Sequence, residues 1–299
     1  MGDVTLILGD ALTELAKLPA ASVDAVVTDP PYGDGLHSEW DRKAGLDWLA
    51  ELPRVLKPSA TVVSFGSFPY MRKLLEAMED IQFRRLWDAV YVKQTAGVRT
   101  HRHLPRYQHE LIMAFCRNGI DRTSLYFDGY GTGIQGKPWV KVNESNRGTY
   151  GHAYGRSISQ GGNIGHPDGA RWMTSVLFGR PKNIMPVSER TTHPSQKPLE
   201  VVLPLVLAIC PRGGVCLDPF MGSGTTGVAC IGTGRKFIGI DRAAEYVELA
   251  RERIGRAQLQ PPLFTPPSNT GFHLTGELAG LQTNFDFGEA SPEPPAGEP

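Results

Sequence analysis

A glycine-rich segment between an apolar run and a helical pattern constrains the fold of this chain more than any other feature. The run from Gly214 to Asp218 is typical of a buried strand, and residues 222 to 227, which open a helical pattern, follow the spacing Gly-x-Gly-x-x-Gly. Asp241 ends the next strand-like run, 19 residues after Gly222. In such a unit the glycines let the backbone approach a ligand, and the acidic residue accepts hydrogen bonds from ribose hydroxyls. The segment predicts a βαβ unit for a dinucleotide or S-adenosylmethionine, the alternative being a turn selected only for helix–sheet packing.

Strand-like and helical patterns alternate along most of the chain. The predicted strands are Val4 to Gly9, Val23 to Thr28, Ala60 to Gly66, Leu86 to Lys93, Leu111 to Arg117, Gly214 to Asp218 and Lys236 to Ile240. The predicted helices are Ala11 to Leu18, Leu46 to Leu56, Tyr70 to Glu79, Pro198 to Ile209, Thr225 to Ile231 and Ala243 to Arg256. Alternation of this kind indicates an α/β fold with a mostly parallel sheet and helices on both faces. No helix separates the strands at 86–93 and 111–117, so they are expected to end the sheet as an antiparallel pair.

Two segments depart from this alternation. Residues 119–190 are rich in Gly, Asn, Ser, Tyr and His and show no period, and a long insert of this kind is usually functional or disordered. Residues 257–299 are rich in proline and carry five acidic and no basic residues, which predicts a largely disordered tail. The sequence therefore predicts one domain in two parts, 1–118 and 191–256, separated by the insert at 119–190 and followed by the tail.

The formal net charge of zero hides an uneven distribution of charge. Residues 93–190 carry 14 Lys and Arg against 6 Asp and Glu. A basic block of this kind indicates a surface that contacts phosphates, although a merely solvated loop is the alternative. The candidates for phosphate or base contacts in this block are Arg99, Arg102, Arg106, Arg147, Arg156 and Arg171.

A second motif, Asp29-Pro30-Pro31-Tyr32, follows the buried strand that begins at Val23. Ligands of open α/β sheets bind at the carboxyl ends of the strands. Two prolines remove two N–H donors and restrict the backbone, so the carboxylate and the proline carbonyls are acceptors with little freedom. A planar amino group under Tyr32 that donates to Asp29 and to the Pro30 carbonyl would satisfy them, and the exocyclic NH2 of adenine or cytosine has this shape. The alternative is a plain turn after a strand.

Two further segments flank the predicted helices. The residues from Thr192 to Pro198 lead into a helix, and a hydroxyl or amide just before Pro198 is placed to cap it. The alternative is that Lys197 and the start of this helix contact the carboxylate of a bound amino-acid moiety. Asp10 follows the first strand and is placed to cap the helix that begins at Ala11.

The cysteines and the length of the apolar segments indicate where in the cell the protein is expected. Cys116, Cys210, Cys216 and Cys230 all lie in apolar runs and form no Cys-x-x-Cys pair, so they are expected to be small buried residues in a reducing compartment, with no metal site. No signal peptide and no apolar segment of 18 residues is apparent. The sequence predicts a cytoplasmic protein without a membrane partner.

Five segments together resemble the DNA amino-methyltransferases that modify adenine N6 or cytosine N4. They are Gly9-Asp10, Asp29-Pro30-Pro31-Tyr32, His193 to Pro198, Asp218 to Thr226 and Phe237 to Asp241. The catalytic motif comes first, then the recognition region, then the cofactor motif, which is the order of the β group of that family. The resemblance covers residues 5 to 256. It implies a Rossmann-like, S-adenosylmethionine-dependent methyltransferase fold with circularly permuted motif order and an inserted target-recognition region at 119–190.

The resemblance also implies residue roles. The S-adenosylmethionine site would consist of Asp10 at the adenine amino group, Ser195 and Lys197 at the methionine part, Asp241 at the ribose, and Asp218, Phe220, Gly222, Gly224 and Thr225 along the pocket. Asp29, Pro30, Pro31 and Tyr32 would hold a flipped target base.

Adenine is favoured over cytosine as the expected target because Asp, not Ser, begins the catalytic tetrapeptide. An enzyme that methylates a protein amide and a catalytically silent DNA-binding module are the other hypotheses. Double-stranded DNA is the expected partner, and the protein is expected in the cytoplasm, associated with the nucleoid. The sequence leaves open a homodimer, a cognate restriction endonuclease and the recognition sequence.

Overall fold

A computed structural model describes residues 3–33, 45–94, 107–129 and 173–260, together with two short paired strands, β9 (Phe264–Thr265) and β10 (His273–Leu274). The strands of the main sheet are β1 (Val4–Leu8), β2 (Val23–Thr28), β3 (Leu56–Gly66), β4 (Phe83–Lys93), β5 (His109–Arg117), β6 (Val176–Gly179), β7 (Val215–Asp218) and β8 (Lys236–Asp241). The α-helices are α1 (Ala11–Leu15), α3 (Leu52–Val55), α4 (Phe68–Asp80), α5 (Leu199–Ile209), α6 (Thr225–Gly232) and α7 (Ala244–Leu259). Two short 3-10 helices, η1 (Asp47–Glu51) and η2 (Arg122–Ser124), complete the described elements.

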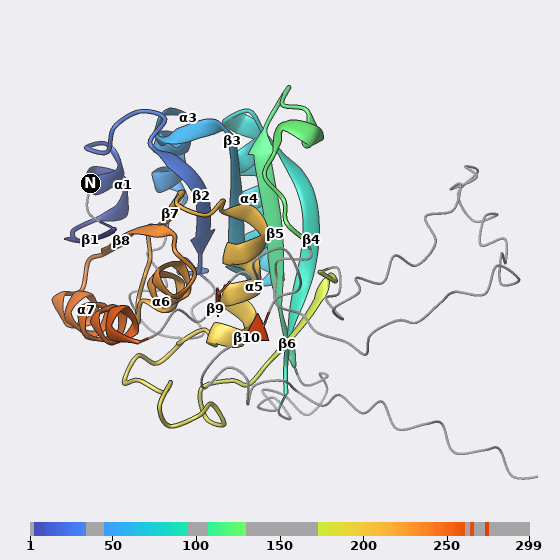
Figure 1. The fold of residues 1–299 in the computed structure, drawn as a ribbon. Helices are drawn as coiled ribbons and strands as arrows, with labels where there is room; N and C mark the ends of the chain where they lie inside the picture. Colours follow the sequence, from blue (N-terminus) through green and yellow to red (C-terminus); the bar gives the residue numbers. More distant parts are fainter. Residues whose placement is uncertain are drawn as a thin grey trace, which may run out of the picture.

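The eight strands form one twisted sheet in the order β1-β8-β7-β2-β3-β5-β4-β6 (Figure 1). Every neighbouring pair is parallel except the two that involve β5, which runs antiparallel to both β3 and β4. The prediction of a mostly parallel α/β sheet with an antiparallel pair formed by β4 and β5 is confirmed. The expectation that this pair ends the sheet is wrong, because β6 pairs with the outer side of β4.

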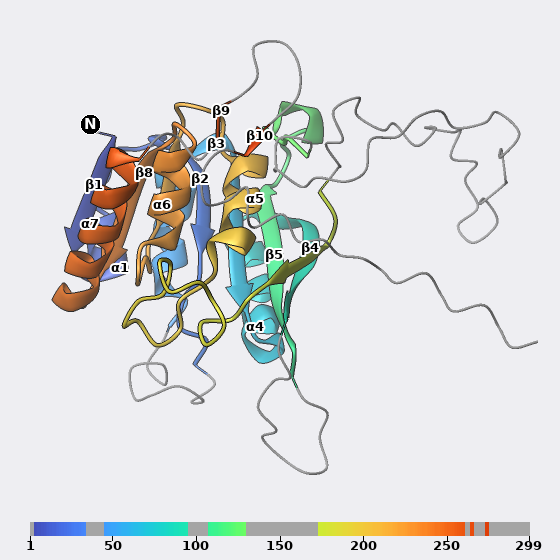
Figure 2. The ribbon, with the colours of Figure 1, turned by 60° about the horizontal axis from the view of Figure 1, so that its bottom comes forward.

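Helices cover both faces of the sheet, as the alternation of patterns predicted. Figure 2 shows α5, α6 and α7 side by side over one face, where the inward side chains of the sheet include Val27 and Cys216. The opposite face packs against α1, η1, α3 and α4, and there the inward side chains include Val26 and Leu217. Neighbouring residues of β2 and of β7 thus enter different cores, because successive side chains of a strand point to opposite faces. All four cysteines are buried free thiols, as expected from the apolar runs that contain them.

The single helix predicted over Leu46 to Leu56 is wrong. The structure has η1 and the one-turn helix α3 in this region, and β3 begins at Leu56 instead of Ala60. Pro58 explains the difference, since the residue before a proline disfavours the α conformation and a helix usually ends at or before it. The helix therefore stops at Val55, and the chain enters the sheet four residues earlier than the apolar pattern suggested.

The strand β6 lies within residues 119–190, where the sequence pattern predicted no regular element. It pairs in parallel with β4 at the edge of the sheet. Gly179 ends it at a crowded point, because a Cβ atom there would lie 2.4 Å from Cγ2 of Val201 and 2.9 Å from Cε2 of Tyr91. A strand of four residues is too short to show a recognisable alternation of apolar and polar residues in the sequence. The position of β6 at the edge of the sheet depends on this contact with α5.

The contact predicts a stability effect. Gly179→Ala should lower the free energy of unfolding by about 1–3 kcal/mol, because the added methyl group overpacks the junction between β6 and α5. Gly255→Ala is the matched control, since Gly255 lies in α7 with open space where its methyl group would be added. It should raise the free energy of unfolding by up to about 1 kcal/mol through helix propensity. Urea denaturation of both variants measures the effect, and equal stability of Gly179→Ala and the parent chain would contradict the packing described for β6.

Candidate active site

The carboxyl ends of β1, β2, β7 and β8 meet at one edge of the sheet, and a cavity of about 890 Å³ opens there. Its volume lies in the range of sites for small molecules and cofactors. All four residues of the predicted catalytic tetrapeptide line it, and so do the predicted cofactor residues Asp10, Ser195, Lys197, Asp218, Phe220, Gly222, Thr225 and Asp241. Gly224 is the one predicted cofactor residue that is not on the cavity wall.

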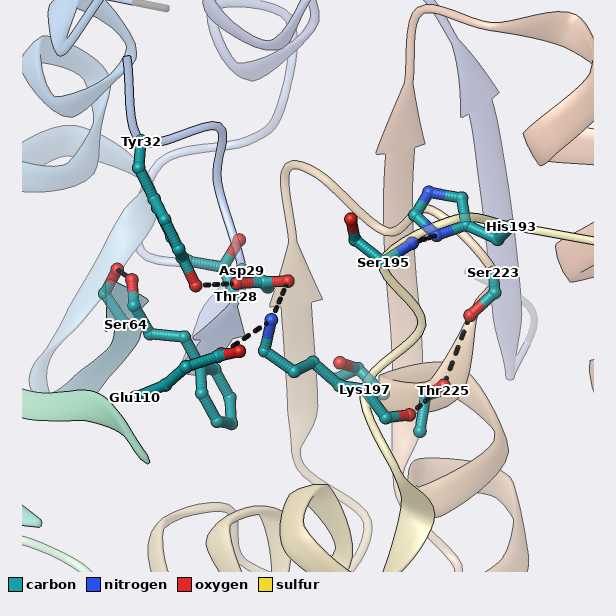
Figure 3. A network of polar contacts seen from close by, with 12 residues as sticks. Thr28, Asp29, Tyr32, Ser64, Glu110, His193, Ser195, Lys197, Ser223 and Thr225 are labelled. Carbon is teal, nitrogen blue, oxygen red and sulfur yellow. Dashed lines mark hydrogen bonds and ion pairs between the residues drawn. The ribbon is translucent and has the colours of Figure 1, made fainter. Parts of the chain in front are cut away.

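The tetrapeptide follows β2 directly and carries its carboxylate into the cavity (Figure 3). The hydroxyl of Tyr32 donates a hydrogen bond to Oδ1 of Asp29. The Tyr32 ring packs against the ring of Tyr70 on α4, with 5.4 Å between the ring centroids. The Asp29 carboxylate and the Tyr32 ring are therefore adjacent and are held by the end of β2 and by α4.

A chain of four charged side chains starts at Asp29. The Nζ atom of Lys197 lies 2.5 Å from Oδ2 of Asp29 and 3.0 Å from Oε2 of Glu110. The other oxygen of Glu110, Oε1, lies 2.6 Å from Nζ of Lys93. These residues come from the segments after β2, before α5, at the start of β5 and at the end of β4, so the antiparallel strand β5 is what brings Glu110 to this edge.

The charges shift one another's pKa values. Burial raises the pKa of Asp29, although Lys197 opposes the shift. Burial also acts to raise the pKa of Glu110, but Lys197 and Lys93 outweigh it and lower this pKa to about 2. The two carboxylates in turn hold the pKa of Lys197 above its ordinary value against the effect of burial. At neutral pH, Lys197 and Glu110 are both charged.

Lys197 makes contacts with two parts of the cavity wall through different atoms. Its backbone carbonyl accepts a hydrogen bond from Oγ1 of Thr225 at 3.0 Å, which ties the segment before α5 to the glycine-rich turn. The side chain extends away from that turn to Asp29 (Figure 3). The role of Lys197 beside the methionine part of a cofactor stays a prediction.

The glycine-rich turn faces the cavity through Gly222. Its φ of +48° is in the left-handed region, and a Cβ atom there would lie 2.9 Å from Nε2 of His193. Its N–H donates to Oδ2 of Asp241 at 3.0 Å, and the N–H of Ala243 donates to Oδ1 at 2.9 Å. Each carboxylate oxygen has a second lone pair, so Asp241 can also accept hydrogen bonds from ligand hydroxyls.

Gly224 has a different place from the one that the spacing predicted. It is the N-cap of α6 with φ +76°, and a Cβ atom there would lie 2.8 Å from Cβ of Ala250 on α7. The Gly-x-Gly-x-x-Gly spacing does not distinguish a glycine that admits a ligand from one that admits a neighbouring helix. In this structure Gly222 lines the cavity and Gly224 lets α6 and α7 pack closely.

Asp218 lies deeper and is surrounded by donors. The Oγ1 atoms of Thr28 and Thr226 both donate to its carboxylate at 2.8 Å, and the N–H of Phe220 donates at 3.1 Å. Burial raises the pKa of Asp218 to about 7, against the effect of these hydrogen bonds. The side chain thus joins β2, β7 and α6 beneath the cavity.

The remaining wall of the cavity includes residues that the sequence did not single out as site residues. His193 packs against Tyr246 of α7, with 4.4 Å between ring centroids, and its Nδ1 accepts a hydrogen bond from the N–H of Ser195 at 3.3 Å. Burial, followed by the effect of Lys197, lowers the pKa of His193 to about 4, so the ring is neutral at pH 7. The ring of Trp48 on η1 packs edge to face against the ring of Phe220, with 5.3 Å between the ring centroids.

The sequence contained a signal for only some of these residues. His193 lies inside a recognised motif, and Glu110 lies beside the strand predicted from Leu111. Trp48 and Tyr246 carry no such signal, because only the packing of η1 and α7 brings them to the cavity. Asp10 is both on the wall and the cap of α1, where its Oδ1 accepts from the N–H of Thr13 at 3.3 Å.

The structure describes only part of the chain, which limits what it shows about DNA contacts, metal sites and membrane spans. The six arginines proposed for DNA contacts lie at 95–106 and 130–172, outside the described residues. Within the described ranges no group of three or more His, Cys, Asp or Glu side chains is arranged to hold a metal ion. No helix in the part of the chain that the structure describes has the length and apolar character needed to cross a membrane.

Comparisons with known proteins identify the family of this chain. The family model described as DNA methylase, for N6 and N4 modification, matches residues 23–252. The DNA adenine methyltransferase YhdJ of Escherichia coli K12 is 32% identical over 263 residues, which cover 84% of this chain and 82% of that protein. The type II methyltransferase M.HpaI of Haemophilus parainfluenzae is 30% identical over 271 residues, 84% of this chain and 74% of the relative.

Solved structures share the fold. The complex of M1.HpyAVI with SAM has a TM-score of 0.57 at 22% identity and covers 84% of this chain and 99% of that one. The cytosine-N4-specific PvuII DNA methyltransferase has a TM-score of 0.58 at 15% identity, with coverage of 86% and 93%. The match to the family model and the two relatives show that this chain belongs to the N6/N4 DNA methylases, a family of S-adenosylmethionine-dependent enzymes.

Proposed function

We propose that this chain transfers a methyl group from S-adenosylmethionine to the N6 amino group of an adenine in DNA. The observation that carries the proposal is that Asp29, a carboxylate next to an aromatic ring, opens into the same cavity as Gly222 and Asp241. A methyl donor at the glycine-rich turn and an amino group at Asp29 would then meet in one enclosed space.

The residues at the glycine-rich end fit S-adenosylmethionine. Gly222 lines the cavity beside His193 without a side chain of its own, and Asp241 has lone pairs for ribose hydroxyls. Asp10, Phe220 and Trp48 form the wall at which we place the adenine ring. When bound, the cofactor supplies a methyl group on a positively charged sulfur.

The residues at the other end fit a planar amino group. We propose that Asp29 and the carbonyl of Pro30 accept hydrogen bonds from the NH2 group and that Tyr32 stacks on the base. The amino nitrogen of a paired base is out of reach inside a duplex, so the target base has to be flipped into the cavity. The amino nitrogen would attack the methyl carbon directly while the bond from this carbon to sulfur breaks, so that the sulfonium leaves as a neutral thioether and the methylated nitrogen loses one proton to solvent. The protein's main contribution would be to position the two groups. None of the four cysteines lies on the cavity wall, so no thiol nucleophile is placed there.

Adenine is proposed as the target base because Asp29 begins the tetrapeptide and because the relative with 32% identity is named an adenine methyltransferase. The cytosine-N4 specificity printed for one structural neighbour belongs to a protein with 15% identity, which supports the fold alone.

Mass analysis of nucleosides tests this choice. Unmethylated genomic DNA is incubated with the chain and S-adenosylmethionine and then digested. We expect N6-methyladenine and no N4-methylcytosine, whereas N4-methylcytosine alone would assign the chain to the other base. A parallel reaction treated with DNase before the cofactor is added should incorporate no methyl group. Incorporation that survives this treatment would favour the protein amide hypothesis, and absence of both products would favour a silent DNA-binding module.

We also propose that residues 119–190 contain the target-recognition region and that Arg99, Arg102, Arg106, Arg147, Arg156 and Arg171 contribute contacts to DNA. The support is the charge of the block that contains them. Association with the nucleoid, a homodimer and a cognate restriction endonuclease stay predictions.

A further inference from the structure

Both oxygens of Asp29 already have donors in the free chain. Oδ1 accepts from the hydroxyl of Tyr32, and Oδ2 accepts from the ammonium group of Lys197 at 2.5 Å. Under the proposed function, Asp29 is the acceptor for the amino group of the target base. A donor from the protein therefore occupies the position that the substrate needs.

The surroundings of this ammonium group resemble those of a target amino group. The Nζ atom of Lys197 lies 5.9 Å from the centroid of the Tyr32 ring and 5.4 Å from that of Phe65. Tyr32 is the ring proposed to stack on the base. The side chain of Lys197 is only 11% exposed, so solvent cannot stabilise its charge if it leaves Asp29.

Glu110 provides a second partner at a short distance. Its Oε2 lies 3.0 Å from Nζ of Lys197, and its Oε1 is held at 2.6 Å by Lys93. The two carboxylates and the two ammonium groups together carry no net charge. When a neutral base replaces Lys197 at Asp29, the ammonium group keeps Glu110 as its counter-ion. Asp29 then keeps two neutral donors, the hydroxyl of Tyr32 and the amino group of the base.

We propose that Lys197 is a stand-in donor that occupies Asp29 until the target amino group binds, and that Glu110 is a positioning residue that retains the ammonium group after the exchange. This inference rests on the proposed function, because it assigns the occupied position on Asp29 to the amino group of a base. It adds a role for Lys197 at the acceptor end of the cavity and a role for Glu110, to which no role was assigned from the sequence.

The inference predicts opposite pH effects for two substitutions. Among the residues that the structure describes, the charged or titratable groups that face Asp29 are Tyr32, Tyr70, Glu110, Lys197 and Asp218, with Lys93 behind Glu110. Lys197→Met removes the nearest cation, so the pKa of Asp29 should rise and the acid limb of kcat/KM for DNA should move up by about one pH unit or more. Glu110→Gln removes a nearby anion, so the pKa of Asp29 should fall and the acid limb should move down.

The two substitutions should also be coupled in the KM for DNA. In Glu110→Gln, Asp29 is the one carboxylate of the described residues that stays paired with Lys197. The ammonium group then competes with the substrate for Asp29, so KM should rise about tenfold, the size expected for one charge-assisted hydrogen bond. In the Lys197→Met background the same change should leave KM unaltered, because no ammonium group remains to compete.

The experiment measures methyl transfer to unmethylated plasmid DNA over a range of pH for the parent chain, both single variants and the double variant. Carboxyl-carbon NMR titration of Asp29, assigned with Asp29→Asn, gives the same pKa directions without reference to activity. Lys57→Met is the matched control, because Lys57 forms a 2.7 Å ion pair with Asp24 away from the cavity. It should move neither the acid limb nor KM. Thermal denaturation verifies that each variant is folded.

Acid limbs that move in the same direction in both single variants would overturn the inference. So would a tenfold KM effect of Glu110→Gln that persists in the Lys197→Met background. Absence of methyl transfer to DNA by the parent chain would instead overturn the proposed function, and the stand-in role with it.

Discussion

Replacing Asp29 with alanine is expected to lower kcat for methyl transfer by about 10²–10³-fold, the range found when one preorganised polar group is removed from an active site. Asp29 is the acceptor that we propose for the target amino group, and its carboxylate is fixed between Tyr32 and Lys197. Without it the amino group loses its main orienting contact, and positioning is the main source of rate proposed for this site. Single-turnover transfer from labelled S-adenosylmethionine measures the effect.

Two further variants test whether the loss of rate in Asp29→Ala is due to the carboxylate. Asp29→Asn retains the shape and one acceptor oxygen, so its loss of rate should be smaller than that of alanine. Tyr32→Phe retains the ring and removes the hydroxyl that occupies Oδ1, so stacking on the base should persist and kcat should change by less than about tenfold. In all three variants calorimetry should show an unchanged affinity for S-adenosylmethionine. An Asp29→Ala variant that transfers methyl groups at the parent rate would contradict the role given to Asp29.

Gly222→Ala is expected to raise the Kd for S-adenosylmethionine by about 10–100-fold. The added methyl group would lie 2.9 Å from Nε2 of His193, and this ring is held by Tyr246 and by the N–H of Ser195. The left-handed φ of +48° adds a cost of about 1–2 kcal/mol for a residue with a Cβ atom. Either the turn must move, or the His193 ring must move toward the cofactor. Both changes disturb the part of the cavity wall at which we place S-adenosylmethionine.

Gly213→Ala is the matched control for this prediction. Gly213 has a similar left-handed φ of +75°, but nothing lies within 4 Å of the position that an added Cβ atom would take. The control thus introduces the same kind of backbone strain away from the cavity. Isothermal calorimetry should show an unchanged Kd for Gly213→Ala, and an equal loss of affinity in both variants would mean that backbone strain, not contact at the cavity wall, limits binding.

Local signals made much of this fold and site predictable. The strand at Val215–Asp218, the left-handed Gly222 and the acidic Asp241 lie within one βαβ unit, so their spacing in the sequence reflects their spacing in the structure. The tetrapeptide after β2 was predictable for a similar reason, since two prolines and an apolar strand define the local backbone. Its place on the cavity then followed from the rule that ligands bind at the carboxyl ends of parallel strands.

Long-range contacts account for what the sequence could not predict. Asp29 and Lys197 are 168 residues apart, and their ion pair depends on how α5 packs against β2. Glu110 reaches the site because β5 runs antiparallel, which places the start of this strand, not its end, beside the cavity. Gly224 satisfied the same spacing rule as Gly222, yet it serves the contact between α6 and α7, since a pattern of glycines does not reveal which atoms approach them.

Transfer of a labelled methyl group to DNA tests the central claim most directly, that one cavity brings the methyl donor and the amino group of a base together at Asp29. The parent chain and Asp29→Ala are each loaded with methyl-labelled S-adenosylmethionine, mixed with unmethylated genomic DNA and quenched after a single turnover, and the DNA is digested to nucleosides. We expect label in N6-methyladenine with the parent chain. With Asp29→Ala we expect almost no label in DNA, although this variant binds the cofactor with unchanged affinity. Equal label in DNA from both proteins, or label in no base with the parent chain, would contradict this claim.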